Sequence, residues 1–213
     1  MMGSEEARVF DDWAGHYDES VRSSEGFPFG GYEAVLEQVV TLAAAEPGCQ
    51  VLDLGIGTGN LAKHFVALNC QVWGIDFSPK MLAVAQAKLP RVHLTQADLA
   101  GTWPAEFRRR FDRIVSAYVF HHFDLAGKVS LLTRLIRDHC TDAGRIVVAD
   151  VSFPTIAALE KAKLQWEKRW DEDEYYWVAE ETVAACEQAD LRLQYRQVTD
   201  FAGVFVLESK SCS

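Results

Sequence analysis

The chain has 213 residues, of which 49% are hydrophobic, and its formal net charge at pH 7 is −10. This length and composition can bury one large core, so a single domain over residues 1–213 is expected. The negative charge disfavours nucleic acid as a partner, and no apolar run reaches the roughly 20 residues of a membrane-spanning helix. The N-terminus also lacks the features of a signal peptide, which predicts a cytoplasmic protein without a membrane partner.

Short apolar strands alternate with amphipathic helices along most of the chain. This alternation predicts an α/β doubly wound sheet, with ligands at the carboxyl ends of parallel strands. Near the C-terminus, two strand-like runs are joined by only Thr199 and Asp200, which implies an antiparallel pair. The expected strands are residues 49–54, 71–76, 92–97, 111–118, 145–151, 191–198 and 201–207, and the expected helices between them lie near residues 60–68, 79–89 and 126–140.

The first of these strands ends in a glycine loop, which is the most specific motif in the chain. Three alternate glycines follow the strand and precede a helical pattern. Glycines let the backbone lie against a ligand, and the amides of the following helix point at the same space. The G-x-G-x-G spacing differs from the dinucleotide fingerprint G-x-G-x-x-G, and the carboxylate of Asp53 would repel a pyrophosphate. The loop therefore predicts a site for a nucleoside with a cationic group, formed by Asp53, Gly55, Gly57, Gly59 and Asn60.

Carboxylates also end the next two strands. Asp76 can accept hydrogen bonds from both hydroxyls of a ribose, and Asp98 can accept from an exocyclic amine. Phe77 and Met81 follow closely enough to cover a base. Any one aspartate alone could simply begin a turn or cap a helix. Three of them at successive strand ends, beside a glycine loop, favour a nucleoside site.

With these motifs, the chain resembles the class I S-adenosylmethionine-dependent methyltransferases over nearly its whole length. Residues 51–60 are similar to the family's cofactor loop, 74–78 to its ribose motif, 97–99 to its adenine motif and 111–115 to its fourth strand. The resemblance implies S-adenosyl-L-methionine as cofactor and S-adenosyl-L-homocysteine as product. It also implies a three-layer Rossmann-like sheet of seven strands in the order 3-2-1-4-5-7-6, with strand 7 antiparallel.

The resemblance also assigns residues to each part of the cofactor. The first two glycines of the loop approach the methionine part, and Asp53 lies near its amino or sulfonium charge. Asp76 holds the ribose, while Asp98 and Leu99 flank the adenine. Within the family, the chain looks closest to small, poorly characterised bacterial methyltransferases with an F-x-D-W-A-x-x-Y-D start and a Y-x-F-H-H segment.

The F-x-D-W-A-x-x-Y-D start occupies residues 10–18. In related enzymes such a segment folds over the cofactor, with the tyrosine, here Tyr17, near the methionine end. The spacing of Phe10, Trp13 and Tyr17 equally suits a helix packed on the core, and both interpretations can hold. Residues 27–31 could hinge a lid. We therefore expect residues 1–31 to form an N-terminal lid segment.

The segment after the fourth strand lies where the transferred methyl group should be, so Ala117 and Tyr118 are expected beside the cofactor. An imidazole there could take a proton from an O, N or S nucleophile, which makes His122 and His121 the candidate catalytic bases. Alternatively, either histidine caps or packs beneath the next helix. No metal is expected, because consecutive residues on a strand point to opposite faces and no Cys or His partner has ligand spacing.

Residues 152–181 form the least standard part and are rich in aromatic side chains. Leu159, Ala162, Trp166 and Trp170 share one helical face, which favours a helix packed on the domain. The alternative is an acceptor pocket, since family members often place substrate-covering elements here, and aromatic rings suit a cation. We expect a helical insertion that covers the acceptor site.

The predicted function is methyl transfer to a small-molecule acceptor by in-line displacement. The cofactor carries an activated methyl group, so the protein mainly aligns the reactants and excludes water. Two alternatives stay open: an NAD-dependent oxidoreductase, which shares the strand, glycine loop and ribose acid, and a non-catalytic S-adenosylmethionine-binding protein. The assembly is open between a monomer and a homodimer.

Overall fold

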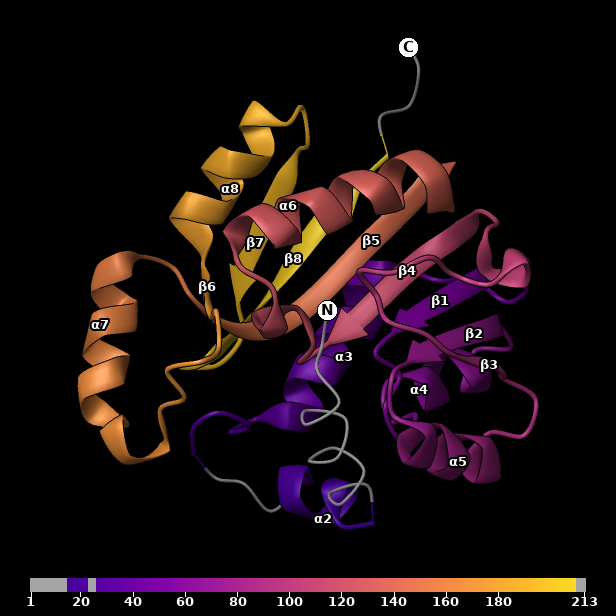
Figure 1. The fold of residues 1–213 in the computed structure, drawn as a ribbon, viewed down its shortest axis with the longest axis horizontal. Coiled ribbons are helices and arrows are strands. Elements are labelled where there is room, and N and C mark those ends of the chain that lie inside the picture. Colours follow the sequence, from indigo (N-terminus) through magenta and orange to yellow (C-terminus); the bar gives the residue numbers. More distant parts are fainter. Residues whose placement is uncertain (1–14, 23–25, 210–213) are drawn as a thin grey trace.

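The computed structural model describes residues 15–22 and 26–209. One twisted sheet crosses the molecule, with helices on both of its faces (Figure 1). Its strands are β1 (Gln50–Leu54), β2 (Gln71–Asp76), β3 (His93–Gln96), β4 (Phe111–Ala117), β5 (Cys140–Phe153), β6 (Trp177–Val178), β7 (Leu193–Gln197) and β8 (Ala202–Glu208).

The strand order confirms the predicted topology. The strands follow the order β3-β2-β1-β4-β5-β8-β7, with the two-residue β6 pairing with β5 off this path. The prediction did not include the short strand β6, so the strands labelled β7 and β8 correspond to the sixth and seventh predicted strands. β8 runs antiparallel to β5 and β7, and β1 to β5 pair in parallel. The order is therefore the expected 3-2-1-4-5-7-6.

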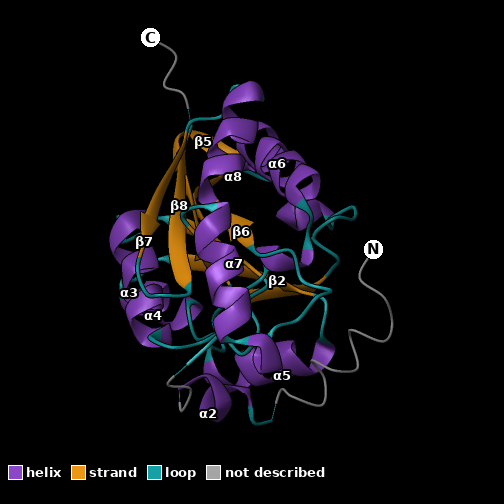
Figure 2. Cartoon of the chain, turned by 90° about the vertical axis from the view of Figure 1, so that its left-hand side faces the viewer, coloured by secondary structure: helices purple, strands orange, loops and turns teal. Residues whose placement is uncertain are grey.

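Alternate strand residues bury opposite faces of the sheet, which gives three layers. Val51 of β1 packs in one hydrophobic cluster and its neighbour Leu52 in the other. Figure 2 shows the sheet edge-on, between the helices that cover its two sides. The helices are α2 (Tyr17–Arg22), α3 (Tyr32–Ala43), α4 (Ala62–Ala67), α5 (Pro79–Lys88), α6 (Leu125–Arg134), α7 (Ile156–Gln165) and α8 (Ala179–Gln188).

The largest departure from the sequence prediction lies between α6 and β5. The expected helix over 126–140 is present, as α6 continued by a π-helical turn over Leu135–His139, but the strand that follows it starts five residues earlier than expected. β5 already begins at Cys140, because Cys140 pairs with Phe111 across a bulge before the regular register starts at Arg145. Tertiary pairing with β4 thus converts a turn-like sequence into strand.

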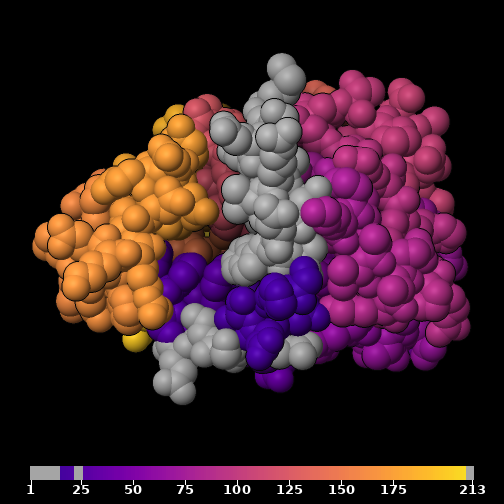
Figure 3. Space-filling view, turned by 60° about the horizontal axis from the view of Figure 1, so that its bottom comes forward, coloured from indigo at the N-terminus to yellow at the C-terminus, as the bar shows by residue number. Residues whose placement is uncertain are grey.

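The topology places a crevice at the carboxyl end of β1. β2 lies on one side of β1 and β4 on the other, so the loops that follow β1 and β4 leave in opposite directions along the sheet. Such a switch point is where open α/β sheets bind ligands. In Figure 3 the described N-terminal residues lie between the magenta central part of the chain and the orange part that follows β5.

None of the helices in the described residues combines the length and the apolar character that crossing a bilayer requires.

Candidate functional site

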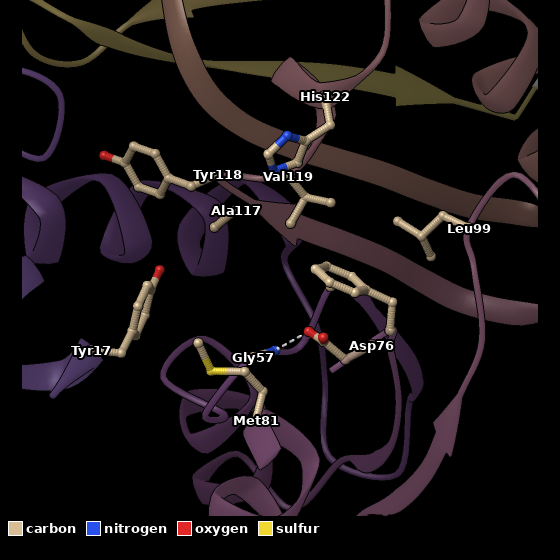
Figure 4. Close-up of a pocket in the computed structure, with 11 residues that line it drawn as sticks. Tyr17, Gly57, Asp76, Met81, Leu99, Ala117, Tyr118, Val119 and His122 are labelled. Atoms are coloured by element: carbon tan, nitrogen blue, oxygen red, sulfur yellow. Dashed lines mark hydrogen bonds between the residues drawn. The ribbon is translucent and has the colours of Figure 1, made fainter. Parts of the chain in front are cut away.

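A pocket opens at the carboxyl ends of β1, β2 and β4 (Figure 4). A smaller hollow adjoins it and shares four of its residues. Of the twelve predicted cofactor-binding residues, only Gly59 and Asp98 are absent from both linings. The pocket is lined by Tyr17, Gly55, Gly57, Asp76, Phe77, Met81, Leu99, Ala117, Tyr118, Val119 and His122. The hollow adds Tyr32, Asp53, Ile56, Thr58, Asn60 and Leu61.

The glycine loop needs glycine for different reasons at different positions. Gly55 and Gly57 both have left-handed backbone, with φ of 66° and 53°. A Cβ on Gly55 would lie 2.4 Å from Cγ2 of Val119, whereas one on Gly57 would meet only the Gly55 carbonyl oxygen, at an ordinary 4.0 Å. A Cβ on Gly59 would instead meet the Leu89 side chain. The first two glycines therefore shape the pocket, and the third serves packing against α5.

Asp76 ties the loop to the end of β2. Its Oδ2 accepts from the Gly57 amide at 2.8 Å (Figure 4), and its Oδ1 accepts from the Ser78 amide at 2.9 Å. Ser78 in turn caps α5 by accepting from the Met81 amide. A carboxylate can accept about four hydrogen bonds, and Asp76 lines the pocket, so its side chain is placed to accept from a ligand hydroxyl.

Asp53 is a buried carboxyl group with an unused oxygen. Its Oδ2 has no hydrogen-bond partner among the described residues, and the whole side chain is buried. Burial, followed by the negative charge of Asp76, raises the pKa of Asp53 well above its usual range. A buried acid of this kind is costly to ionise unless it meets a cation. The hollow beside the glycine loop therefore suits a positively charged ligand group.

The N-terminal helix α2 closes over this hollow. Oδ1 of Asp18 accepts from the Thr58 hydroxyl at 2.6 Å and from Nδ2 of Asn60 at 2.9 Å, and Oδ2 pairs with Lys88. Tyr17, one residue earlier, lines both the pocket and the hollow. The sequence prediction included Tyr17 but not Asp18, although the two are adjacent in the quoted Y-D motif. Phe10 and Trp13 lie outside the described residues.

The end of the pocket where adenine is expected is apolar, and the predicted residue Asp98 does not line it. Phe77, Met81 and Leu99 line the pocket. Oδ1 of Asp98 accepts from the Ala100 amide at 2.9 Å, so the carboxylate stabilises its own turn. Leu99 rather than Asp98 is the residue of this motif that faces the pocket.

The opposite end of the pocket is formed by the turn after β4. Tyr118 has left-handed backbone, with φ of 59°, and its ring stacks on Tyr32. A 3-10 helix follows over Phe120–His122. The sequence interpretation, which placed the two histidines on a strand with opposite directions, is therefore wrong. Their ring centroids lie 4.3 Å apart.

The two histidines differ in what surrounds them. His122 lines the pocket, and burial together with the positive charge on His121 lowers its pKa to about 4. His121 is absent from the pocket lining. Its Nδ1 lies 2.7 Å from Asp150 and its Nε2 lies 3.5 Å from Glu174. Burial opposes its protonation, but Asp150 and then Glu174 outweigh burial and raise its pKa. The ring of His122 is therefore neutral near pH 7.

Asp150 on β5, which was not predicted from the sequence, holds His121 and Trp177 in place at the His122 end of the pocket. It is fully buried at the end of β5, and its oxygens accept from the His121 amide, the Val151 amide and the indole N–H of Trp177. A charged residue within the apolar run Val147–Phe153 was the available signal.

The segment 152–181 has two roles. The aromatic residues of its first half pack on the core: Trp170 stacks on Phe27 with ring centroids 5.4 Å apart, and Trp166 packs against Phe201. Its second half reaches the 3-10 turn after β4, where the Tyr175 amide donates to the His121 carbonyl at 2.7 Å. The packed-helix interpretation is confirmed for α7, where Ala162 is buried in the core, but the helix ends at Gln165, before Trp166 and Trp170.

Comparisons with known proteins agree on one kind of fold and domain. A family model described as a methyltransferase domain matches residues 51–144. An uncharacterized methyltransferase of Alkaliphilus oremlandii is 30% identical, over 93% of this chain and 86% of that protein.

Solved structures share the fold at low sequence identity. A complex of DhpI with SAH has a TM-score of 0.71 at 18% identity and covers 95% of this chain and 94% of its own. The magnesium protoporphyrin IX methyltransferase ChlM of Synechocystis PCC 6803, solved with bound SAH, has a TM-score of 0.70 at 15% identity. It covers 95% of this chain and 99% of its own.

Proposed function

The chain belongs to the class I S-adenosylmethionine-dependent methyltransferases, and on this premise we propose that it methylates a small-molecule acceptor by in-line displacement. S-adenosylmethionine is the cofactor and S-adenosylhomocysteine the product. The observation that carries the proposal is the unpartnered, buried Oδ2 of Asp53 beside a glycine loop. This oxygen supports a cationic ligand group at the place where the family holds the methionine part.

The other pocket residues fit the remaining parts of the cofactor. The Asp76 carboxylate would accept hydrogen bonds from the ribose hydroxyls. Phe77, Met81 and Leu99 would cover the base with apolar surface. Among the predicted cofactor residues, Gly59, which packs on α5, and Asp98, which stabilises its own turn, line neither the pocket nor the hollow.

The acceptor would enter at the end formed by Ala117, Tyr118, Val119 and His122. The methyl group of the bound cofactor is already activated, so alignment and exclusion of water are the main demands on the protein. Asp18 of helix α2 accepts hydrogen bonds from Thr58 and Asn60 in the glycine loop, so α2 covers the loop and would help to exclude water. The neutral ring of His122 can take the proton that the acceptor loses. The net charge of −10 favours small molecules over nucleic acid as acceptors.

The test is transfer of tritium from methyl-labelled S-adenosylmethionine in the presence of separated small-molecule and macromolecular fractions of a cell extract. We expect label in the small-molecule fraction, and about 5- to 150-fold less of it when the Asp76→Ala variant replaces the wild type at limiting cofactor. Label confined to the macromolecular fraction would overturn the small-molecule acceptor. No label in any fraction would favour a non-catalytic cofactor-binding protein.

A further inference from the structure

A cluster of nitrogen and oxygen ligand atoms lies at the acceptor end of the pocket. His121, His122 and Glu174 each offer one such atom, and these atoms lie within 4.8 Å of one another. Two imidazoles and a carboxylate form a ligand set that Zn²⁺ uses in proteins. Because His122 also lines the pocket, the cluster lies at the pocket's edge.

We propose that His121, His122 and Glu174 form a binding site for a divalent transition metal ion of the Zn²⁺ class.

The distance between the ligand atoms of His121 and Glu174 fits a shared metal ion better than a direct hydrogen bond. His121 Nε2 and Glu174 Oε1 are 3.5 Å apart. A charge-assisted hydrogen bond between such groups is shorter, about 2.7–2.9 Å. Two ligands on a tetrahedral Zn²⁺, with bonds of about 2.0–2.2 Å, lie about 3.4 Å apart. The pair is therefore spaced as two ligands of one ion.

Asp150 gives His121 the orientation that a metal ligand needs. It lies 2.7 Å from His121 Nδ1, and it also accepts from the His121 amide at 2.8 Å. Since Nδ1 is engaged by Asp150, Nε2, which faces Glu174, is the ring nitrogen that can bind an ion. A carboxylate behind a ligating histidine is the usual outer-shell partner in protein metal sites.

Glu174 comes from a distant part of the chain but is held in place. The amide of Tyr175 donates to the His121 carbonyl at 2.7 Å, and the Tyr175 carbonyl accepts from Lys128. The Tyr176 hydroxyl hydrogen-bonds the Glu174 carboxylate. The backbone on one side and a side chain on the other therefore fix the third ligand against the 3-10 turn.

The local charge also favours a dication. Three carboxylates, those of Asp150, Glu174 and Asp171, act on the two imidazoles, and Lys128 is the cation that acts on His121. Carboxylates in excess of fixed cations stabilise a bound divalent ion. The mixed nitrogen and oxygen ligands favour Zn²⁺ over Mg²⁺, which prefers oxygen ligands and retains water.

The role of such an ion rests on the proposed function. Three protein ligands leave a fourth position open, and an acceptor hydroxyl or thiol bound there would lose its proton to solvent more readily. The lone pair of His122 would then be engaged by the ion. His122 therefore acts as a proton acceptor in the metal-free protein and as a ligand in the metal-loaded protein.

Zinc binding is measured by isothermal titration calorimetry on untagged protein that has been treated with EDTA and dialysed. We expect one equivalent of Zn²⁺ to bind the wild type and Mg²⁺ not to compete. His121→Ala and Glu174→Gln should each weaken Zn²⁺ binding by at least about tenfold, and Asp150→Asn by about 10- to 100-fold. His93→Ala, which removes an exposed imidazole on β3, and Cys70→Ser are the matched controls. Both should bind Zn²⁺ as the wild type does.

Crystals soaked in Zn²⁺ should show an anomalous peak between the three ligands at the zinc edge. Absence of Zn²⁺ binding to the wild type would overturn the proposal, as would wild-type affinity in both His121→Ala and Glu174→Gln. Titration of the same variants with S-adenosylhomocysteine separates this outcome from failure of the proposed function. Loss of Zn²⁺ binding with cofactor affinity retained supports the metal site alone.

Discussion

The two ends of the pocket are built in different ways. At the cofactor end, contacts join neighbouring strand ends: Asp76 ends β2, and Gly57, 19 residues earlier, lies in the loop that follows the adjacent parallel strand β1. At the acceptor end, His121 is held by Asp150 from β5 and by Tyr175 from the segment beyond α7. The first end depends on local turns, and the second on tertiary contacts between later parts of the chain. Mutations at one end should therefore leave the structure and binding properties of the other end unchanged.

The largest effect is expected at the acceptor end. Asp150→Ala removes a fully buried carboxylate and leaves His121 and the Trp177 indole without their acceptor. Loss of one partner from such a buried pair should lower the free energy of unfolding by about 3–5 kcal/mol. Urea denaturation measures this loss. Asp142→Ala, whose side chain is 97% exposed, is the control and should change stability by less than about 0.5 kcal/mol.

The next largest effect is expected in the glycine loop. Gly55→Ala combines left-handed strain with a Cβ 2.4 Å from Val119, so stability should fall by about 2–4 kcal/mol. Gly48→Ala has the strain without a nearby atom and should cost about 1–2 kcal/mol. Thermal and urea unfolding compare the two. If Val119→Ala recovers none of the Gly55→Ala loss, the close contact is not its cause.

A smaller effect is expected on cofactor affinity. Asp76→Ala should weaken binding of S-adenosylhomocysteine by about 1–3 kcal/mol, because the ribose loses hydrogen bonds to a charged group. Calorimetric titration measures the change. Asp98→Ala is the comparison, since its carboxylate accepts from its own turn. Equal losses in both variants would refute the distinction between these two acids.

The pH dependence of binding should report on Asp53. Burial and the charge of Asp76 raise its pKa, and a cationic ligand group prefers its ionised form. Affinity should therefore fall as the pH is lowered through this raised pKa, by at most about tenfold per pH unit because one proton is exchanged. Asp53→Asn should flatten the profile of S-adenosylhomocysteine affinity. An unchanged profile in Asp53→Asn would assign the pH dependence to another group.

The smallest effect is expected at the lid. Asp18→Asn loses the ion pair with the half-exposed Lys88 but can still accept from Thr58. Cofactor affinity should fall by about 1 kcal/mol or less. A faster dissociation rate in stopped-flow displacement would show that α2 slows cofactor release. Glu19→Gln, on the same helix, is the matched control.

The cofactor end was largely predictable because its features are local. Strand, glycine loop and terminal acid are adjacent in the sequence, so Asp76 and Met81 could be placed from patterns alone. Asp18 was missed because its partner Thr58 lies 40 residues away. At the acceptor end, a 3-10 turn carries no periodic signal, so the histidines were assigned to a strand. The early start of β5 likewise depends on pairing between Cys140 and Phe111, which no local pattern encodes.

The central claim is that the cofactor end binds its ligand independently of the acceptor end. Isothermal titration of S-adenosylhomocysteine into wild type, Asp76→Ala and His122→Ala tests it most directly. We predict binding to the wild type, a weakening of about 5- to 150-fold in Asp76→Ala, and affinity within about twofold of wild type in His122→Ala. No binding to the wild type, or an equal loss in both variants, would contradict the claim.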